Sequence, residues 1–207
     1  MSTPADKARA YFADTFAKHG ASPLGLDWNG TESQMRRLAV LVDEIPNSPD
    51  ISVNDIGCGY GSFLGLLHGR GQSGFTYTGY DLVRGMIDHA NEKYKNQPGI
   101  SFICGGTESL NPADYTVASG TFNMKQDVPA KDWDAYVKSC LTQMLGHTRK
   151  RMAVNFLTSY SDAEYMRDDL YYPDPKDMFD FGMRATGAAA IRHNYGLYDF
   201  TLIIDQI

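Results

Sequence analysis

The feature of this chain that most constrains its fold is the segment of residues 53–67, VNDIGCGYGSFLGLL. A short apolar run is followed by glycines at alternate positions, Gly57, Gly59 and Gly61, and an apolar helix-like run begins at Phe63. This order predicts a strand, a tight turn and a helix. Because glycine has no Cβ atom, the turn bends sharply and a ligand can approach its backbone. The free N–H groups at the start of the helix point toward the same place, so the segment predicts a nucleotide or cofactor site.

The spacing of the glycines indicates which kind of cofactor is bound. Dinucleotide-binding turns carry G-x-G-x-x-G, with an acidic residue about 20 residues further on. Here the pattern is G-x-G-x-G, and Asp55 stands two positions before the first glycine. A second strand-like run, residues 75–80, ends at Asp81, whose carboxylate can accept both ribose hydroxyls of a bound nucleoside. A nicotinamide site and a glycine turn without a ligand are the alternatives.

The ordered pattern D-x-G-x-G-x-G, with an acid at the end of the next strand, resembles the class I S-adenosylmethionine (SAM) dependent methyltransferases. The resemblance implies that Asp55 and the three glycines belong to the SAM site, with the glycines near the methionine portion. It implies that Asp81 holds the ribose, that Leu82 or Val83 lies against the adenine, and that S-adenosylhomocysteine (SAH) is the product.

Length and charge narrow the class of protein. A chain of 207 residues with 43% apolar residues is expected to form one packed domain. The net charge of −6, from 19 basic and 25 acidic residues, disfavours a nonspecific nucleic-acid binder. The densest basic run, residues 148–151, is expected to close a helix C-terminus, where cations complement the helix dipole.

Cysteine usage and hydropathy bear on location. The three cysteines form no C-x-x-C pair and show no metal-ligand spacing, so no metal is expected and a cytoplasmic location is favoured. No apolar run approaches the length of about 18 residues that a membrane span requires. The N-terminal residues lack the apolar core of a signal peptide.

Strand-like and helix-like runs alternate along the chain. Helices are expected at residues 4–19, 32–45, 62–67, 84–95, 133–145 and 178–186. Strands are expected at residues 51–56, 75–80, 100–104, 114–118, 151–157, 188–194 and 198–205. Alternation predicts an α/β fold with a parallel sheet covered by helices on both faces. The short link near Gly196 makes the last two strands an antiparallel hairpin.

The resemblance implies a Rossmann-like class I methyltransferase fold, with a seven-stranded, mostly parallel sheet in the order 3-2-1-4-5-7-6. Residues 1–46 are expected to form a helical lid, and residues 47–207 the SAM-binding domain. In such doubly wound sheets, ligands bind outside the carboxyl ends of the strands. The candidate site residues are therefore sought in the segments that follow each strand.

Two of these segments offer candidates. After the third strand, family members often place an acid near the adenine amine, whereas this chain has C-G-G-T-E, so Thr107 or Glu108 could take that place. After the fourth strand, residues 119–123 (SGTFN) occupy the position that faces the methyl group. Ser119 is expected to contact SAM, and Asn123 either orients the substrate or makes an ordinary turn bond. The segment has no proline pair, which disfavours methylation of an adenine N6 amine.

The N-terminal helices hold further candidates. Arg37 or Gln34 could meet the SAM carboxylate, because arginine binds carboxylates through two parallel hydrogen bonds. A solvated helix face is the alternative for Arg37, and simple packing is the alternative for Trp28.

The C-terminal third is expected to cover the acceptor. Its candidates are polar and aromatic, namely Tyr160, Tyr165, Tyr171, Tyr172, His193, Asn194 and Tyr195. Tyr172 and His193 join Asn123 as candidate catalytic residues, and His193 is either a general base or a hydrogen-bonded structural histidine.

Several functions remain open at this stage. The first is a methyltransferase acting on a small molecule, with no membrane partner, nucleic acid disfavoured, and a monomeric or homodimeric state. The alternatives are a methyltransferase acting on protein or nucleic acid, a noncatalytic SAM-binding module and a nicotinamide oxidoreductase. Four further segments, near residues 28–37, 118–123, 168–175 and 193–201, resemble a bacterial group of small methyltransferases.

Overall fold

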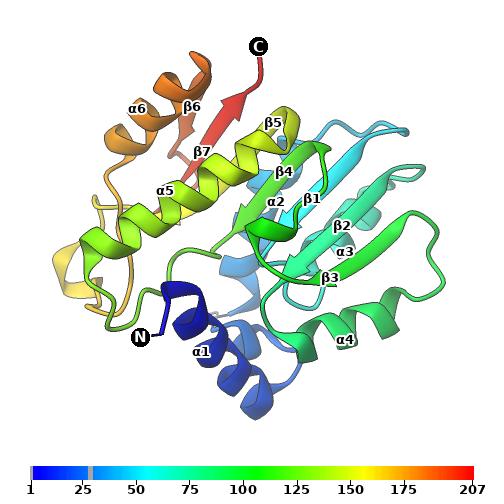
Figure 1. Cartoon of the computed structure of the whole chain (residues 1–207), viewed down its shortest axis with the longest axis horizontal. Helices are drawn as coiled ribbons and strands as arrows, with labels where there is room; N and C mark the ends of the chain where they lie inside the picture. Colours follow the sequence, from blue (N-terminus) through cyan, green and yellow to red (C-terminus); the bar gives the residue numbers. More distant parts are fainter. Residues whose placement is uncertain (1, 28–29) are drawn as a thin grey trace.

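The computed structural model describes residues 2–27 and 30–207. Seven strands form one sheet in the order β3-β2-β1-β4-β5-β7-β6, which confirms the predicted order (Figure 1). The strands are β1 (Ser52–Ile56), β2 (Thr76–Asp81), β3 (Ile100–Cys104), β4 (Ala113–Ser119), β5 (Thr148–Leu157), β6 (Ala189–Arg192) and β7 (Asp199–Asp205). Only β7 runs against its neighbours, because it pairs antiparallel with both β5 and β6.

The register of the central strands brings their carboxyl ends to one level. Ile56, the last residue of β1, pairs with Tyr80 of β2 on one side and with Ala118 of β4 on the other. The residues that follow these three positions therefore meet at the same edge of the sheet. Asp81 and Ser119 lie there beside the glycine turn.

Helices cover both faces of the sheet. The α-helices are α1 (Pro4–His19), α2 (Thr31–Asp43), α3 (Ser62–Gly69), α4 (Arg84–Tyr94), α5 (Ala130–Gly146) and α6 (Pro175–Thr186). Short 3₁₀ turns are η1 (Pro23–Leu26), η2 (Thr107–Ser109) and η3 (Ala163–Tyr165). One face carries α2, α3 and α4, and the other carries α5 and α6. Figure 1 shows α5 in front of the sheet, and α1 beyond the carboxyl ends of the parallel strands.

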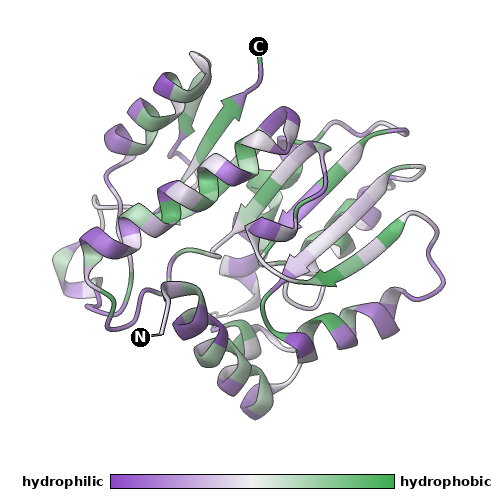
Figure 2. Ribbon diagram, in the orientation of Figure 1, coloured by the Kyte–Doolittle hydropathy of each residue, from purple (hydrophilic) through white to green (hydrophobic). Residues whose placement is uncertain are grey.

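Helix α5 packs on the sheet through the apolar face that its sequence pattern forms. Apolar and polar residues alternate in bands along it (Figure 2), which is the pattern of a helix with one buried face. Trp133, Val137, Leu141 and Met144 form this face and are almost completely buried against the sheet. The helix is thereby fixed against β5, with its N-terminal end toward the carboxyl ends of the parallel strands.

One predicted boundary is wrong. Residues 148–151 do not close a helix, because α5 ends at Gly146 and these residues begin β5. Thr148 is buried, and its hydroxyl donates to the Met144 carbonyl at 2.7 Å. Arg151 pairs with Asp205 of β7 and with Glu44 at the end of α2. Arg151 therefore joins β5 to β7 and to the end of α2, rather than complementing a helix dipole.

Other differences are shifts of element ends. Pro175 begins α6 earlier than predicted, because the Asp174 side chain accepts a hydrogen bond from the Lys176 N–H and caps the helix. In the described parts of the chain, every helix is too short or too polar to cross a bilayer.

Leu141 tests the α5 packing. Its side chain is fully buried, so Leu141→Ala is expected to lower the free energy of unfolding by about 2–5 kcal/mol. The neighbouring Thr142 is exposed, and Thr142→Ala should change stability by no more than about 0.5 kcal/mol. Urea unfolding of the two variants measures this difference, and equal effects would contradict the packing described.

Candidate active site

A cavity of about 290 Å³ opens at the carboxyl ends of β1, β2 and β4. Its size lies at the lower limit of common ligand pockets, about 300–1,000 Å³. Among the predicted cofactor-binding residues, those that line it are Asp55, Gly57, Asp81, Leu82, Thr107 and Ser119. Residues of α1 and α2 close the cavity from the opposite side, among them Ala8, Phe12 and Gln34.

Asp81 is fixed at the end of β2. Its Oδ2 accepts a hydrogen bond from the Gly59 N–H at 3.0 Å, and its Oδ1 accepts one from the Val83 N–H at 2.9 Å. Burial raises the pKa of this carboxyl group, while backbone hydrogen bonds from Val83, Gly59 and Leu82 act in the opposite direction. A carboxylate has about four acceptor sites, so Asp81 can still accept a hydroxyl group of a ligand.

The glycine turn is crowded by the chain itself. Gly57 has φ +69°, and a Cβ atom there would lie 2.5 Å from Thr121 Oγ1. Gly59 has φ +55°, and its Cβ would lie 2.8 Å from Leu26 of η1. Both positions combine a left-handed backbone with close approach, which only glycine accepts readily. Gly59 and Gly61 do not line the cavity, and a Cβ atom at Gly61 would meet Tyr94 and Phe102 of the core.

Asp55 is buried beneath the glycine turn. Its Oδ2 accepts a hydrogen bond from the Tyr77 hydroxyl at 2.6 Å. Burial, reinforced by the nearby charge of Asp81, raises the pKa of Asp55 to about 7, although the Tyr77 hydrogen bond lowers it. Asp55 therefore changes its charge near neutral pH.

The wall near Thr107 contains residues that the sequence did not single out. Thr107 Oγ1 donates to Gln143 Oε1 of α5 at 2.8 Å, and the Glu108 carboxylate accepts from the Gly106 N–H at 2.8 Å. Trp133 also lines the cavity, and its Nε1–H donates to the Phe122 carbonyl at 2.8 Å. From the sequence alone, the residues by which α5 lines the cavity look like part of an ordinary amphipathic helix.

Of the two α2 residues predicted to meet the SAM carboxylate, Gln34 lines the cavity and is buried. Arg37 lies instead in a smaller pocket beside it, of about 90 Å³. The Nε of Arg37 donates to Asp199 Oδ1 at 2.9 Å, and its Nη2 lies 2.7 Å from Asp199 Oδ2. Burial raises the pKa of Asp199, and the hydrogen bond and charge of Arg37 act against that shift. Trp28 is outside the described residues.

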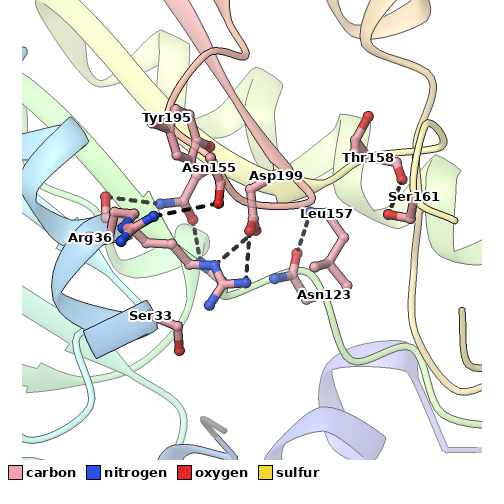
Figure 3. A network of polar contacts seen from close by, with 12 residues as sticks. Ser33, Arg36, Asn123, Asn155, Leu157, Thr158, Ser161, Tyr195 and Asp199 are labelled. Carbon is pink, nitrogen blue, oxygen red and sulfur yellow. Dashed lines mark hydrogen bonds and ion pairs between the residues drawn. The ribbon is translucent and has the colours of Figure 1, made fainter. Parts of the chain in front are cut away.

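The three candidate catalytic residues do not meet at one place. Asn123 lines the smaller pocket, and its Oδ1 accepts from the Leu157 N–H at 3.2 Å (Figure 3). The Tyr172 hydroxyl accepts from the Arg167 N–H at 3.1 Å. The exposed His193 lies 2.9 Å through its Nε2 from Thr158 Oγ1, and its ring stacks on Phe200. Asn123 is thus the candidate that the fold brings nearest to the cavity.

Asn155 of β5 ties the smaller pocket to the strand ends (Figure 3). Its Oδ1 accepts from the Gly120 N–H at 2.8 Å. Its Nδ2 lies within 3.4 Å of the Arg37 carbonyl and 3.3 Å of Ser119 Oγ. One buried amide therefore connects the turn after β4 to helix α2.

The cavity residues fit SAM in their chemistry. A carboxylate with free lone pairs stands beside an apolar surface formed by Leu82, Val83 and Met86, as a ribose and an adenine require. Polar groups at Ser119 and Gln34 lie on other walls, where a charged methionine portion needs partners. In the described part of the chain, no cluster of three His, Cys, Asp or Glu residues could bind a metal ion.

Comparison with known proteins agrees with this geometry. Residues 53–150 match a family model described as a methyltransferase domain. A Mycobacterium tuberculosis protein named as a methyltransferase is 40% identical over 162 residues. The match covers 77% of this chain and 96% of that protein.

Solved structures resemble the fold. Magnesium protoporphyrin IX methyltransferase from Synechocystis PCC 6803 with bound SAH has a TM-score of 0.68 at 15% identity, covering 99% of this chain and 100% of that one. A Haloferax volcanii protein, solved in complex with the Trm112 methyltransferase activator, has a TM-score of 0.66 at 13% identity and covers 95% of this chain and 98% of its own. At these identities the likeness concerns the fold.

The raised pKa of Asp55 predicts a pH dependence of stability. The folded pKa of about 7 lies above the ordinary aspartate pKa of 3.8, so the folded state holds more protons between these values. The stability of the wild type relative to Asp55→Asn should therefore fall by about 1 kcal/mol per unit as pH rises from 4 to 7, and level off above that. Urea unfolding at several pH values measures this, with exposed Asp88→Asn as control. A difference independent of pH would contradict it.

The Arg37–Asp199 pair predicts strong coupling. Arg37→Met leaves the buried Asp199 carboxylate without its cation and should cost about 3–5 kcal/mol of unfolding free energy. Adding Asp199→Leu removes the stranded charge, so the double variant should recover much of that loss. A thermodynamic cycle from denaturant unfolding tests this. Additive effects of the two changes would show that the pair is not coupled.

Proposed function

Because this chain belongs to the methyltransferase family, we propose that it transfers a methyl group from SAM to a nucleophilic atom of a small molecule. The observation that carries the proposal is the Asp81 carboxylate, held by two backbone N–H groups at the lip of the cavity beside the glycine turn. A nucleoside is the ligand whose paired hydroxyls and flat apolar base fit that arrangement.

The reaction places modest demands on the protein. SAM, when bound, supplies a methyl group already activated by the adjacent sulfonium charge. The acceptor atom uses its lone pair to form a bond to the methyl carbon, while the carbon–sulfur bond breaks and its electron pair stays on sulfur. Holding the two partners in line can lower the barrier by about 7–11 kcal/mol. If the acceptor atom must lose a proton, the proton goes to a base or to water. A positioned base then raises the rate by about 10²–10⁴-fold.

The N-terminal helices support a second part of the proposal, namely that residues 1–46 act as a lid on the domain formed by residues 47–207. Ala8 and Phe12 of α1 and Leu38 of α2 form the wall opposite the strand ends. Leu26 of η1 occupies the space that a side chain at Gly59 would need. The lid therefore packs on the cofactor turn itself, so ligand entry and lid position are linked.

A small acceptor is favoured over a macromolecule for two reasons. The chain carries a net charge of −6, which opposes nucleic-acid phosphates. The cavity and the adjoining pocket lie beneath the N-terminal helices, because Phe12 and Leu26 line both. A small molecule fits beneath these helices more easily than a macromolecule does.

Calorimetric titration with SAM, SAH and NAD tests the cofactor assignment. SAM and SAH are expected to bind and NAD is not. Asp81→Ala removes the carboxylate and should weaken SAM at least about tenfold, because hydrogen bonds to charged groups contribute about 1.5–3 kcal/mol each. Asp88→Ala, which removes an exposed acid on neighbouring α4, should leave the affinity unchanged. Binding of NAD alone, or equal SAM affinity in the Asp81 variant, would refute the proposal.

A further inference from the structure

Asp55 lines the cofactor cavity, and the protein uses only one of its two carboxyl oxygens. The residue is 3% exposed, and its Oδ2 accepts a hydrogen bond from the Tyr77 hydroxyl at 2.6 Å. Among the described residues, no donor forms a hydrogen bond to the second oxygen, Oδ1. A buried acceptor of this kind in a cavity wall is satisfied by a donor or a positive charge of the ligand.

The protein places no positive charge against Asp55 in the part of the chain that the structure describes. The nearby charge that acts on this group is that of Asp81, which is also an acid. The basic side chain in the described cavity lining is Arg9, which is exposed and pairs with Asp6 at 2.7 Å. Burial and the charge of Asp81 raise the pKa of Asp55 to about 7, so the group is partly protonated at neutral pH.

The other titratable groups beside Asp55 are Tyr77, Cys58 and Asp81. Burial raises the pKa of the Tyr77 hydroxyl and of the Cys58 thiol well above their usual values, so both stay neutral. Backbone hydrogen bonds favour the charged form of Asp81. Within residues 2–27 and 30–207, the lining contains no histidine, and α2 adds no titratable side chain to it. The remaining titratable side chains of the described lining are Arg9, Tyr80, Glu108, Tyr136 and Cys140.

SAM and SAH differ by one charge. SAM carries a sulfonium centre in addition to its amino and carboxylate groups, whereas the sulfur of SAH is neutral. A cavity of about 290 Å³ is only a few atoms wide, so a charge inside it lies close to every wall. A unit charge about 8 Å away, acting through an effective dielectric constant of about 20, shifts an ionisation equilibrium roughly thirtyfold. A cation in the cavity therefore favours the ionised form of Asp55.

Resting on the proposed function, we propose that Asp55 releases its proton when SAM binds, and that the resulting carboxylate makes the cavity prefer the charged donor SAM to the product SAH. The O–H bond of Asp55 breaks, its electron pair stays on oxygen, and the proton passes to water. SAM affinity therefore rises from acid toward neutral pH, and it levels off where Asp55 is already ionised before SAM binds. Loss of the sulfonium charge on methyl transfer lets Asp55 regain its proton, which favours release of SAH.

Calorimetric titration with SAM at pH 6.0, in two buffers with different enthalpies of ionisation, counts the released protons. The wild type should release most of one proton for each SAM bound, because Asp55 is largely protonated at this pH before binding. Between pH 5.5 and 7.0 the amino group of SAM largely keeps its charge. In this range SAM affinity should rise about tenfold and SAH affinity by no more than about threefold. Equal rises for SAM and SAH would overturn the proposed preference.

Two variants test the role of Asp55. Asp55→Asn resembles the protonated acid, and its side-chain oxygen can still accept from Tyr77. This variant should release no proton and bind SAM equally at pH 5.5 and 7.0. Tyr77→Phe keeps the ring but removes the hydrogen bond that lowers the pKa of Asp55, so the rise in SAM affinity should move to higher pH. The matched control is Asp88→Asn, at an exposed acid on α4, which should behave as the wild type does.

The outcomes separate the role of Asp55 from the cofactor assignment. SAM binding without proton release, or equal release from the wild type and Asp55→Asn, rejects the role of Asp55 and leaves the cofactor site in place. If SAM binds the wild type at no pH, both the cofactor assignment and the role of Asp55 are rejected.

Discussion

The structure of the site depends on hydrogen bonds that join the glycine turn to the end of β2. The N–H groups of Gly57 and Cys58 both donate to the Tyr80 carbonyl, at 2.8 and 3.0 Å. The next residue after Tyr80 is Asp81, and its carboxylate accepts a third hydrogen bond from the same turn, donated by the Gly59 N–H. Turn and carboxylate are therefore positioned by each other, and both are held at the level where β1, β2 and β4 end. The N-terminal helices, the cavity and the smaller pocket are all arranged around this junction.

The N-terminal segment both closes the cavity and extends the hydrophobic core. Ala8 is the buried residue of α1, and Leu26 fills the space behind Gly59. Helix α2 is anchored twice, by its apolar side against α3 and by Arg37 against Asp199. The second anchor joins residues 162 positions apart, so the N-terminal and C-terminal parts of the chain meet beside the smaller pocket.

Much of the fold could be predicted from local patterns, and the reasons are physical. Alternating apolar runs and glycine-marked turns identify the strands of a parallel sheet, and parallel strands bring Asp81, Ser119 and the glycine turn together without further information. The antiparallel end follows from the short link at Gly196. The basic run at residues 148–151 misled because its partners, Asp205 and Glu44, are distant in sequence.

The rest of the site could not be read in the same way. Trp133 belongs to the apolar stripe of α5 and Gln143 to a polar one. Nothing in the spacing of those residues distinguishes a cavity wall from ordinary packing. In the sequence, Arg37 looks like a residue of a solvated helix face, and only the fold places Asp199 against it. Charge pairing across the fold is a three-dimensional property, because the interacting groups carry no sequence signal that links them.

The reversed direction of β7 has a consequence for how such a protein can diversify. The residues that follow the parallel strands β1, β2, β3 and β4 line the cavity, so a change in any of these segments alters the cavity wall. Because β7 runs the other way, its beginning, Asp199, lies at the ligand edge, preceded by the exposed link from β6. This link and the loop after β5 can change in length and chemistry without moving the glycine turn. The reversed strand thus separates the segments that form the cavity from a segment that can be rebuilt without altering them.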